Sequence, residues 1–464
     1  MLFCIENCWF SGFSQSAIRI VTTSGVGMLR NVVLRNNTAI ENGGALSIES
    51  AFSVIIKSSK FENNHAPDYG GAVYISSIYS TSQVVLTSVS FLENEASLGG
   101  ATYVSRFSDL SLNNVGMKKN RAKQGSAIFT QSATVYANDL VIKESESSNG
   151  DLVHCLGTLL SFKRSKFANN NVGTGIVVGT FCELSIDDSV FSHNKGTAIR
   201  LASSSTLSIQ STTFEFNNAQ TGMDGGAVHC SGCTTVRISE ESKFVNCTAN
   251  RGGALSFVNS PDVIISDVEL TANVATLGGG GGMYYTGKVA PAFFNTIWNK
   301  NHALYGNDRA SEPKAINVSV PIEIRNTEIL QAKVQLIDYY GSIVDDRKTT
   351  MTVRSSMHAT SIQNNDNRKF TSDTNIVLLG TTESIYKDAI SIFDDLILSA
   401  HPSNVTLKFQ LDLPGSTIET SILIKVLPCK SGQYLSLEGS PLCADCIAGK
   451  ASNNWVPGKL CLNC

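Results

Sequence analysis

Two short phrases alternate along the first 305 residues of this chain of 464. One is Phe-x-x-Asn, as in Phe61 to Asn64, and the other is Gly-Gly-Ala followed by an apolar residue, as in Gly43 to Leu46. A repeat of about 23 to 30 residues constrains the fold more than any other signal, because one unit cannot bury its own apolar face and the units must stack. The Phe-x-x-Asn copies begin at Phe61, Phe91, Met117, Phe167, Phe191, Phe214 and Leu270. The glycine copies begin at Gly43, Gly70, Gly99, Gly225 and Gly252, with degenerate copies at Gly125, Gly173 and Gly196.

Apolar residues alternate with polar ones on both sides of these phrases. Val54 and Ile56 precede Phe61 in this way, and Leu46 and Ile48 follow the first glycine pair. A period of two is that of a strand with one buried face. Each repeat therefore gives about three short strands. We predict an all-β fold in which residues 1–310 form a parallel β-helix of about 11 coils.

The two phrases have structural roles in such a coil. We expect Asn64 and its copies to form an internal ladder at a turn, each amide bonding to its neighbours and to turn backbone. The glycine pair permits positive φ and close backbone approach at a corner. The coils near Ile142 and Ile297 lack both phrases, yet their spacing and alternation predict that they stay in register.

Composition and the N-terminus limit the possible partners and location. The net charge of -3 gives no case for a nucleic-acid partner or an anionic membrane surface. No apolar run of about 18 residues is present, and the N-terminus does not resemble a signal peptide. Phe3 and Ile5 instead suit the interior of a repeat. We therefore expect a chain truncated at both ends, with membrane attachment only through segments absent from it.

The repeat resembles that of the chlamydial polymorphic membrane proteins, and it is similar to repeats in large β-helical surface proteins of protists. The resemblance covers about residues 1–305 and depends on alternating copies of both phrases. It implies a right-handed β-helix at a cell surface, with adhesion the usual role. The chlamydial members end in an outer-membrane barrel, and nothing here resembles one, which favours the protist type.

Residues 311–428 carry strand-like runs without the repeat. About seven such runs predict an immunoglobulin-like β-sandwich after a linker at Ser311–Lys314. The phrase from Leu336 to Gly341 resembles the strand and turn of invasin-like or filamin-like modules. We expect this module to act as a spacer that caps the coil end.

The last segment, residues 429–464, is rich in cysteine, and its Cys-x2-Cys pairs have a spacing that suits zinc. The phrases around them resemble the ephrin-receptor-like repeat of extracellular stalks, which favours disulfides and implies further repeats beyond the chain. The candidate disulfide cysteines of this module are Cys429, Cys443, Cys446, Cys461 and Cys464.

Cysteines also occur inside the coils. Cys155 and Cys182 are 27 residues apart, about one coil, and could meet in adjacent turns. Cys230, Cys233 and Cys247 share one coil and lack the helix N-terminus that would favour thiol redox chemistry, so structural disulfides or buried thiols are expected. Twelve cysteines indicate an oxidising, extracellular compartment. Four candidate N-glycosylation sequons point the same way, at Asn36, Asn246, Asn317 and Asn404.

Many parallel β-helices are carbohydrate-active enzymes, and these cluster carboxylates on outward positions of adjacent coils. Glu49 is the only carboxylate in the two outward columns after the glycines, and Asp224 looks like a turn residue. Arg200 and His229 have no acidic partner in these columns. We place the first column at Ser47, Tyr74, Tyr103, Phe129, Val177, Arg200, His229, Ser256 and Tyr285. We place the second at Glu49, Ser76, Ser105, Gln131, Gly179, Ala202, Ser231, Val258 and Gly287.

Tyr74, Tyr103 and Phe129 fall on three successive coils in the first column. A coil spacing of about 4.8 Å stacks these rings into one aromatic ladder. The ladder is either packing under a neighbouring loop or a contact platform for a sugar or a partner protein.

The sequence as a whole predicts a non-enzymatic cell-surface or secreted protein that displays a ligand-binding or adhesive face. The expected partner is an unidentified protein or carbohydrate, and no cofactor or metal is expected. Two alternatives stay open, namely a polysaccharide lyase or hydrolase and a purely structural spacer.

Overall fold

The computed structural model describes residues 3–21, 25–77, 82–147, 150–326, 328–359, 376–400, 402–436, 442–446, 450–451 and 462–463. Across these residues the secondary structure consists of strands joined by turns. The chain divides into two compact units, Met1–Ser311 and Glu312–Cys464, and each is described by itself.

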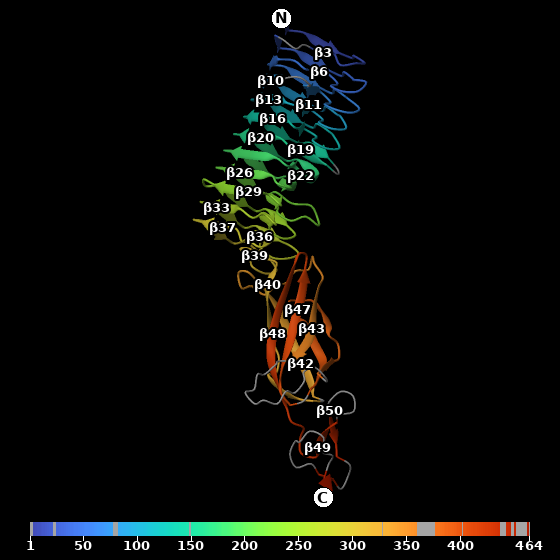
Figure 1. Ribbon diagram of the computed structural model, residues 1–464. Helices are drawn as coiled ribbons and strands as arrows, with labels where there is room; N and C mark the ends of the chain where they lie inside the picture. Colours follow the sequence, from blue (N-terminus) through green and yellow to red (C-terminus); the bar gives the residue numbers. More distant parts are fainter. Residues whose placement is uncertain are drawn as a thin grey trace. The chain divides into compact units, whose positions relative to one another are not determined.

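The first unit is a parallel solenoid of twelve coils, against the predicted eleven or so, and each coil gives one strand to each of three long sheets (Figure 1). Sheet A contains β1 (Phe3–Glu6), β4 (Val26–Arg30), β7 (Ser53–Lys57), β10 (Ser82–Thr87), β13 (Ser108–Asn113), β16 (Thr134–Asn138), β20 (Leu159–Lys163), β23 (Glu183–Asp187), β26 (Thr206–Gln210), β29 (Thr235–Ser239), β33 (Val263–Ser266) and β37 (Ala292–Phe294). Sheet B contains β2 (Trp9–Ser11), β5 (Val33–Arg35), β8 (Lys60–Glu62), β11 (Ser90–Leu92), β14 (Gly116–Lys118), β17 (Val141–Lys143), β21 (Lys166–Ala168), β24 (Val190–Ser192), β27 (Thr213–Glu215), β30 (Lys243–Val245), β34 (Glu269–Thr271) and β38 (Ile297–Asn299).

Sheet C follows the glycine phrases. It contains β3 (Ile18–Val21), β6 (Leu46–Glu49), β9 (Val73–Ser76), β12 (Thr102–Ser105), β15 (Ile128–Gln131), β19 (Asp151–Leu156), β22 (Asn171–Thr180), β25 (Lys195–Ala202), β28 (Val228–Ser231), β32 (Leu255–Val258), β36 (Met283–Thr286) and β39 (Arg309–Ser311). The short strands β18 (Glu146–Ser147), β31 (Thr248–Ala249) and β35 (Val274–Ala275) extend the pairing at the turn before this sheet.

The phenylalanines of the repeat form an internal ladder along sheet B. Phe61 and Phe91 stack with their ring centroids 4.9 Å apart, and both are buried. Ile142 occupies the same inward position, so its coil is in register as predicted. In the last coil the inward position belongs to Trp298, whereas the neighbouring Ile297 is 62% exposed. Stacked aromatic pairs add to the burial of apolar area and hold successive coils in one register.

The asparagines form a second ladder beside it. The Asn64 side-chain amide donates to Asn94 Oδ1 and to the Leu34 carbonyl oxygen, each at a distance of 3.0 Å. The same Asn94 oxygen accepts the Asn64 backbone N–H at 3.0 Å. Buried amides are costly unless they are hydrogen-bonded, so each member stabilises its neighbours. Ser145 and Cys247 interrupt the ladder, and each still donates its backbone N–H to the side-chain oxygen of the asparagine in the next coil.

The two glycines of the glycine phrase have different structural roles. Gly70 has φ 64, in the left-handed region that favours glycine. Gly71 lies against the next coil, where an added Cβ would collide with the carbonyl oxygen of Gly100. The first glycine therefore turns the corner, and the second allows the coils to approach closely.

The second unit contains a two-sheet sandwich whose sheets meet at Phe393 and Phe409, 5.5 Å apart between ring centroids. One sheet has the order β40-β42-β46-β44 and the other β41-β48-β47-β43-β45, with β41 parallel to β48. Two mainly antiparallel sheets packed face to face, one of them with four strands, are also the plan of immunoglobulin domains. The strands are β40 (Pro313–Ser319), β41 (Glu323–Arg325), β42 (Ile329–Asp338), β43 (Met351–Ala359), β44 (Val377–Leu379), β45 (Glu383–Tyr386), β46 (Ser391–Ser399), β47 (Asn404–Leu413) and β48 (Ser416–Leu427).

The cysteine-rich segment follows with two short hairpins, β49 (Gln433–Ser436) with β50 (Leu442–Asp445) and β51 (Lys450–Ala451) with β52 (Leu462–Asn463). Cys429 and Cys443 form a disulfide. Cys446 is disulfide-bonded too, while Cys461 and Cys464 lie outside the described residues. Two of the four cysteines with zinc spacing are thus oxidised, which removes the thiolates that a zinc site requires.

Candidate functional site

The outer face of sheet C holds the candidate contact residues. Its register agrees with the predicted column except in two coils, where Val178 and Tyr284 replace the predicted Val177 and Tyr285. Val177 and Tyr285 pair with the inward residues Ile199 and Phe257, because the strand begins one residue later than predicted in the first of these coils and one residue earlier in the second. The full outward column is Arg19, Ser47, Tyr74, Tyr103, Phe129, His154, Val178, Arg200, His229, Ser256, Tyr284 and Ala310.

The second outward column shows the same one-residue correction. Thr180 and Thr286 occupy the positions predicted for Gly179 and Gly287. Glu49 belongs to this column, and its carboxylate is bound by Arg19 at 2.8 Å. The Arg19 hydrogen bond lowers the pKa of Glu49, so this carboxylate is an ion-pair partner and not a proton donor.

The predicted aromatic ladder exists and is longer than predicted. Tyr74 and Tyr103 stack at 5.6 Å between ring centroids, and Tyr103 and Phe129 at 5.2 Å. Tyr69, from the turn before the glycines, lies over Tyr103 at 4.7 Å, and His154 continues the stack 4.8 Å beyond Phe129. His154 belongs to a coil without a glycine phrase, which is why the sequence pattern did not include it.

Burial divides the ladder into two parts. Tyr103 and Phe129 are 7% and 5% exposed, so these two rings mainly pack under their neighbours. Tyr69 is 37% exposed and Tyr74 is half-buried, so the accessible surface of the ladder belongs to them. Tyr69 and Tyr74 are therefore the accessible rings of this ladder, and its contact role is still a prediction.

His154 is fixed by a buried carboxylate. Its Nδ1 lies 2.8 Å from Asp151 Oδ2, and Asp151 is buried in the same strand, β19. The other Asp151 oxygen accepts the backbone N–H of Gly125 in the preceding coil. This pair holds the imidazole flat on Phe129, which is a structural task that requires no substrate.

A cluster of charged side chains occupies the later coils of the same face. Asp224, a turn residue as predicted, accepts two N–H groups of Arg251 at 2.9 and 3.3 Å. The Arg251 guanidinium also lies 4.7 Å from the centre of the Tyr284 ring. Arg200 stands in the outward column one coil before His229 and interacts with Asp224 through charge. Sequence reasoning missed this acidic neighbour because Asp224 lies in the turn and not in the column.

A groove of about 710 Å³ follows the asparagine corner. Residues that flank the ladder positions of five successive coils line it, as Glu93 and Glu95 do beside Asn94. The position of these residues next to the repeated asparagine was the sequence signal that could have revealed the groove. The lining residues are Asn63, Glu93, Glu95, Lys119, Arg121, Glu144, Glu146 and Asn169.

Two of the four carboxylates that line this groove are paired with lysine side chains. Lys118 binds Glu144 at 2.9 Å, and Lys119 lies 3.9 Å from Glu93. The Lys118 hydrogen bond lowers the pKa of Glu144. A general acid in a glycosidase needs the opposite, a carboxyl pKa raised by burial or by a second carboxylate.

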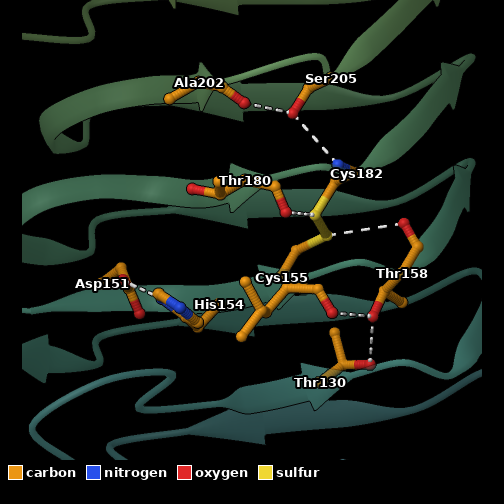
Figure 2. The surroundings of a disulfide bond; sticks show 10 residues. Thr130, Asp151, His154, Cys155, Thr158, Thr180, Cys182, Ala202 and Ser205 are labelled. Carbon is orange, nitrogen blue, oxygen red and sulfur yellow. Dashed lines mark hydrogen bonds and ion pairs between the residues drawn. A yellow bond between two sulfur atoms is a disulfide. The ribbon is translucent and has the colours of Figure 1, made fainter.

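The solenoid cysteines fall into three groups. Cys155 and Cys182 form a disulfide across one coil, with Cα atoms 6.4 Å apart (Figure 2). Cys182 belongs to a column of small polar corner residues, where its backbone N–H donates to Ser205 Oγ at 3.1 Å. The remaining described cysteines are free thiols, exposed at Cys4 and Cys8 and buried at Cys230, Cys233 and Cys247.

Two of the four candidate sequons share one repeat position. Asn36 and Asn246 both precede a ladder position and have φ of 53 and 52, a region in which asparagine is enriched. Asn36 and Asn317 are exposed, whereas Asn246 and Asn404 are partly buried. Glycosylation at these four positions remains a prediction.

Two further features are absent from the described part of the chain. No group of three or more His, Cys, Asp or Glu side chains is placed to hold a metal ion. No helix there has the length and apolar character to cross a membrane.

Comparison with known proteins identifies the solenoid. Residues 151–320 match the model of a right-handed β-helix region, so this part of the chain is similar to right-handed parallel β-helix proteins. Residues 58–76 match the model of the Chlamydia polymorphic membrane protein repeat, so this stretch is similar to that repeat. Together the two matches support a surface protein built on a β-helix. No curated protein and no solved structure matches the chain.

Proposed function

We propose that this protein is displayed at a cell surface or secreted, and that the outer face of sheet C binds a protein or carbohydrate ligand without chemical turnover. The observation that carries the proposal is the stacking of Tyr69 on Tyr103, which leaves Tyr69 and Tyr74 accessible on an ordered support. Tyrosine joins an apolar ring to a hydroxyl and loses little conformational freedom, so it is favoured in contact surfaces.

Several features support display over catalysis. Glu49 beside these aromatic residues is paired with Arg19, and Glu93 and Glu144 in the groove are paired with lysines. A surface location agrees with the polymorphic-membrane-protein repeat and with disulfides at Cys155 and Cys429, because disulfides persist in oxidising compartments.

The test is a Tyr69→Ser/Tyr74→Ser double variant measured for binding to host cells and to a glycan array. Tyr136→Ser is the matched control, because Tyr136 is 46% exposed and lies on sheet A. We expect loss of binding in the double variant alone, with an unchanged melting temperature. Full binding by a folded double variant would reject this face as the contact site, and absence of binding by the native protein would favour the spacer role.

A further inference from the structure

The charged cluster on the later coils carries a positive excess. Arg251 and Asp224 neutralise each other through their two hydrogen bonds, and both side chains are largely buried. Arg200, one coil before Asp224, adds a second guanidinium that has no carboxylate of its own. The local sum over these three side chains is therefore one positive charge in a partly desolvated place.

Arg200 has unused hydrogen-bonding capacity. Its recorded polar contact, among the described residues, is Nη1 to the sulfur of Met223 at 3.1 Å. A thioether sulfur is a weak acceptor, whereas a guanidinium has five N–H donors. Burial lowers the pKa of Arg200, which reflects the cost of holding its charge there, and the charge of Asp224 offsets this in part. An oxyanion would fill both the charge and the donor requirement.

The loop beside Arg200 differs from its counterparts. Gly225 follows Asn217 by eight residues, whereas Gly99 follows Asn94 by five. The extra residues form a turn in which the Met223 N–H donates to the Gln220 carbonyl oxygen at 2.9 Å. Gln220 also reaches back two coils to the Val172 carbonyl oxygen at 2.8 Å. The turn thus places the Met223 side chain against the Arg200 guanidinium and covers one side of that group.

We propose that Arg200 is an oxyanion-binding residue that receives a sulfate or carboxylate group of an acidic polysaccharide on the outer face of sheet C. The guanidinium fork matches both groups. Successive outward positions lie about 4.8 Å apart, so an extended polymer can contact several coils. The inference rests on the proposed ligand-binding role of this face and adds the chemistry of the ligand.

The experiment is calorimetric titration of the full chain at about 50 and 200 mM salt. The probes are chondroitin sulfate, polygalacturonate, inorganic sulfate, neutral dextran and polyglutamate. Arg200→Met keeps the aliphatic stem, and Arg200→Lys keeps the charge without the fork. Arg237→Met is the matched control, because Arg237 already pairs with Asp262 at 2.6 Å on sheet A.

We expect the native chain to bind the two acidic polysaccharides and not dextran. Arg200→Met should weaken that binding about tenfold or more, Arg200→Lys less, and Arg237→Met not at all. Binding should fall at the higher salt. Inorganic sulfate that competes for the site would show that the anion alone is recognised, which supports the same role for Arg200.

Three outcomes would overturn the inference. These are unchanged polysaccharide binding in folded Arg200→Met, no binding of either acidic polysaccharide by the native chain, or Arg200-dependent binding of polyglutamate alone, which would indicate an acidic protein. The Tyr69→Ser/Tyr74→Ser variant separates the two proposals. Loss of binding in Arg200→Met but not in that variant would retain the Arg200 site and reject the aromatic contact.

Discussion

Asn273 Oδ1 accepts a hydrogen bond from the backbone N–H of Cys247 at 2.9 Å, but the Cys247 side chain has no amide with which to continue the asparagine ladder. Its thiol lies 3.7 Å from the Phe214 carbonyl oxygen, a place that an asparagine amide fills in most other coils. The two residues mark one gap in the ladder, and Ser145 marks another.

Replacing Cys247 with Asn should close this gap. The new amide can donate to the Phe214 carbonyl and to Asn273 Oδ1 and can accept from Asn217, and asparagine is close to cysteine in size. We expect the unfolding free energy to rise by about 1 kcal/mol. Thermal melting of the two proteins checks this, and a lower melting temperature for Cys247→Asn would contradict it.

The ladder should matter far more than the neighbouring surface. Asn170 is buried, receives the Ser145 backbone N–H and donates to Asn194, so Asn170→Ala leaves several buried groups without partners. We expect a loss of about 2 to 3 kcal/mol. Asn171→Ala, at the exposed position beside it, is the control and should change stability by less than about 0.5 kcal/mol. Denaturant unfolding of both variants decides, and equal effects would refute a stabilising ladder.

Close approach of the coils makes Gly71 intolerant of any side chain. Gly71→Ala would press a methyl group into the Gly100 carbonyl oxygen, whereas the same change at Gly116 meets nothing within 4 Å. We expect Gly71→Ala to lose a few kcal/mol and Gly116→Ala to be neutral or slightly stabilising. Melting temperatures of the pair give the answer, and similar values for both would argue against tight packing at the glycine corner.

The thiols should differ sharply in reactivity. Burial raises the pKa of Cys247 to about 12 and that of Cys230 well above its usual value. We expect iodoacetamide at about pH 8 to modify Cys4 and Cys8 in the folded protein, and the buried thiols only after unfolding. Peptide mass spectrometry identifies which cysteines carry the label. Native-state labelling of Cys247 as fast as Cys8 would show that the interior opens.

The same shift predicts a pH dependence of stability. An unfolded thiol ionises near 8.5, so between about pH 9 and 12 the unfolded chain loses the Cys247 proton while the folded chain keeps it. The unfolded state then binds fewer protons, and stability falls as pH rises, by up to about 1.4 kcal/mol per pH unit for this group. Cys247→Asn should remove that part of the decline when unfolding is measured across this range.

Much of the coil could be predicted because each repeat encodes its own strands. Phe61, Asn64 and the glycine pair have fixed spacing, and the fold gives them the inward ladders and corner predicted for them. The copies that escaped detection, at Leu34 with Asn37, Phe244 with Cys247 and Trp298 with Asn301, each replace one member of the phrase. A pattern search loses such copies, while the structure keeps them because the neighbouring coils fix the register.

By itself the sequence determined the parallel β-helix and the alternation of inward and outward residues. It also determined the separation of one coil that allows Cys155 and Cys182 to meet. Only the tertiary structure decided which outward residues are accessible. It placed Tyr69 over Tyr103 and brought Asp224, the partner of Arg251, close enough to Arg200 to interact through charge. The physical reason is that contacts between coils depend on the length and path of each turn, which can differ by one or two residues without disturbing the repeat of the strands.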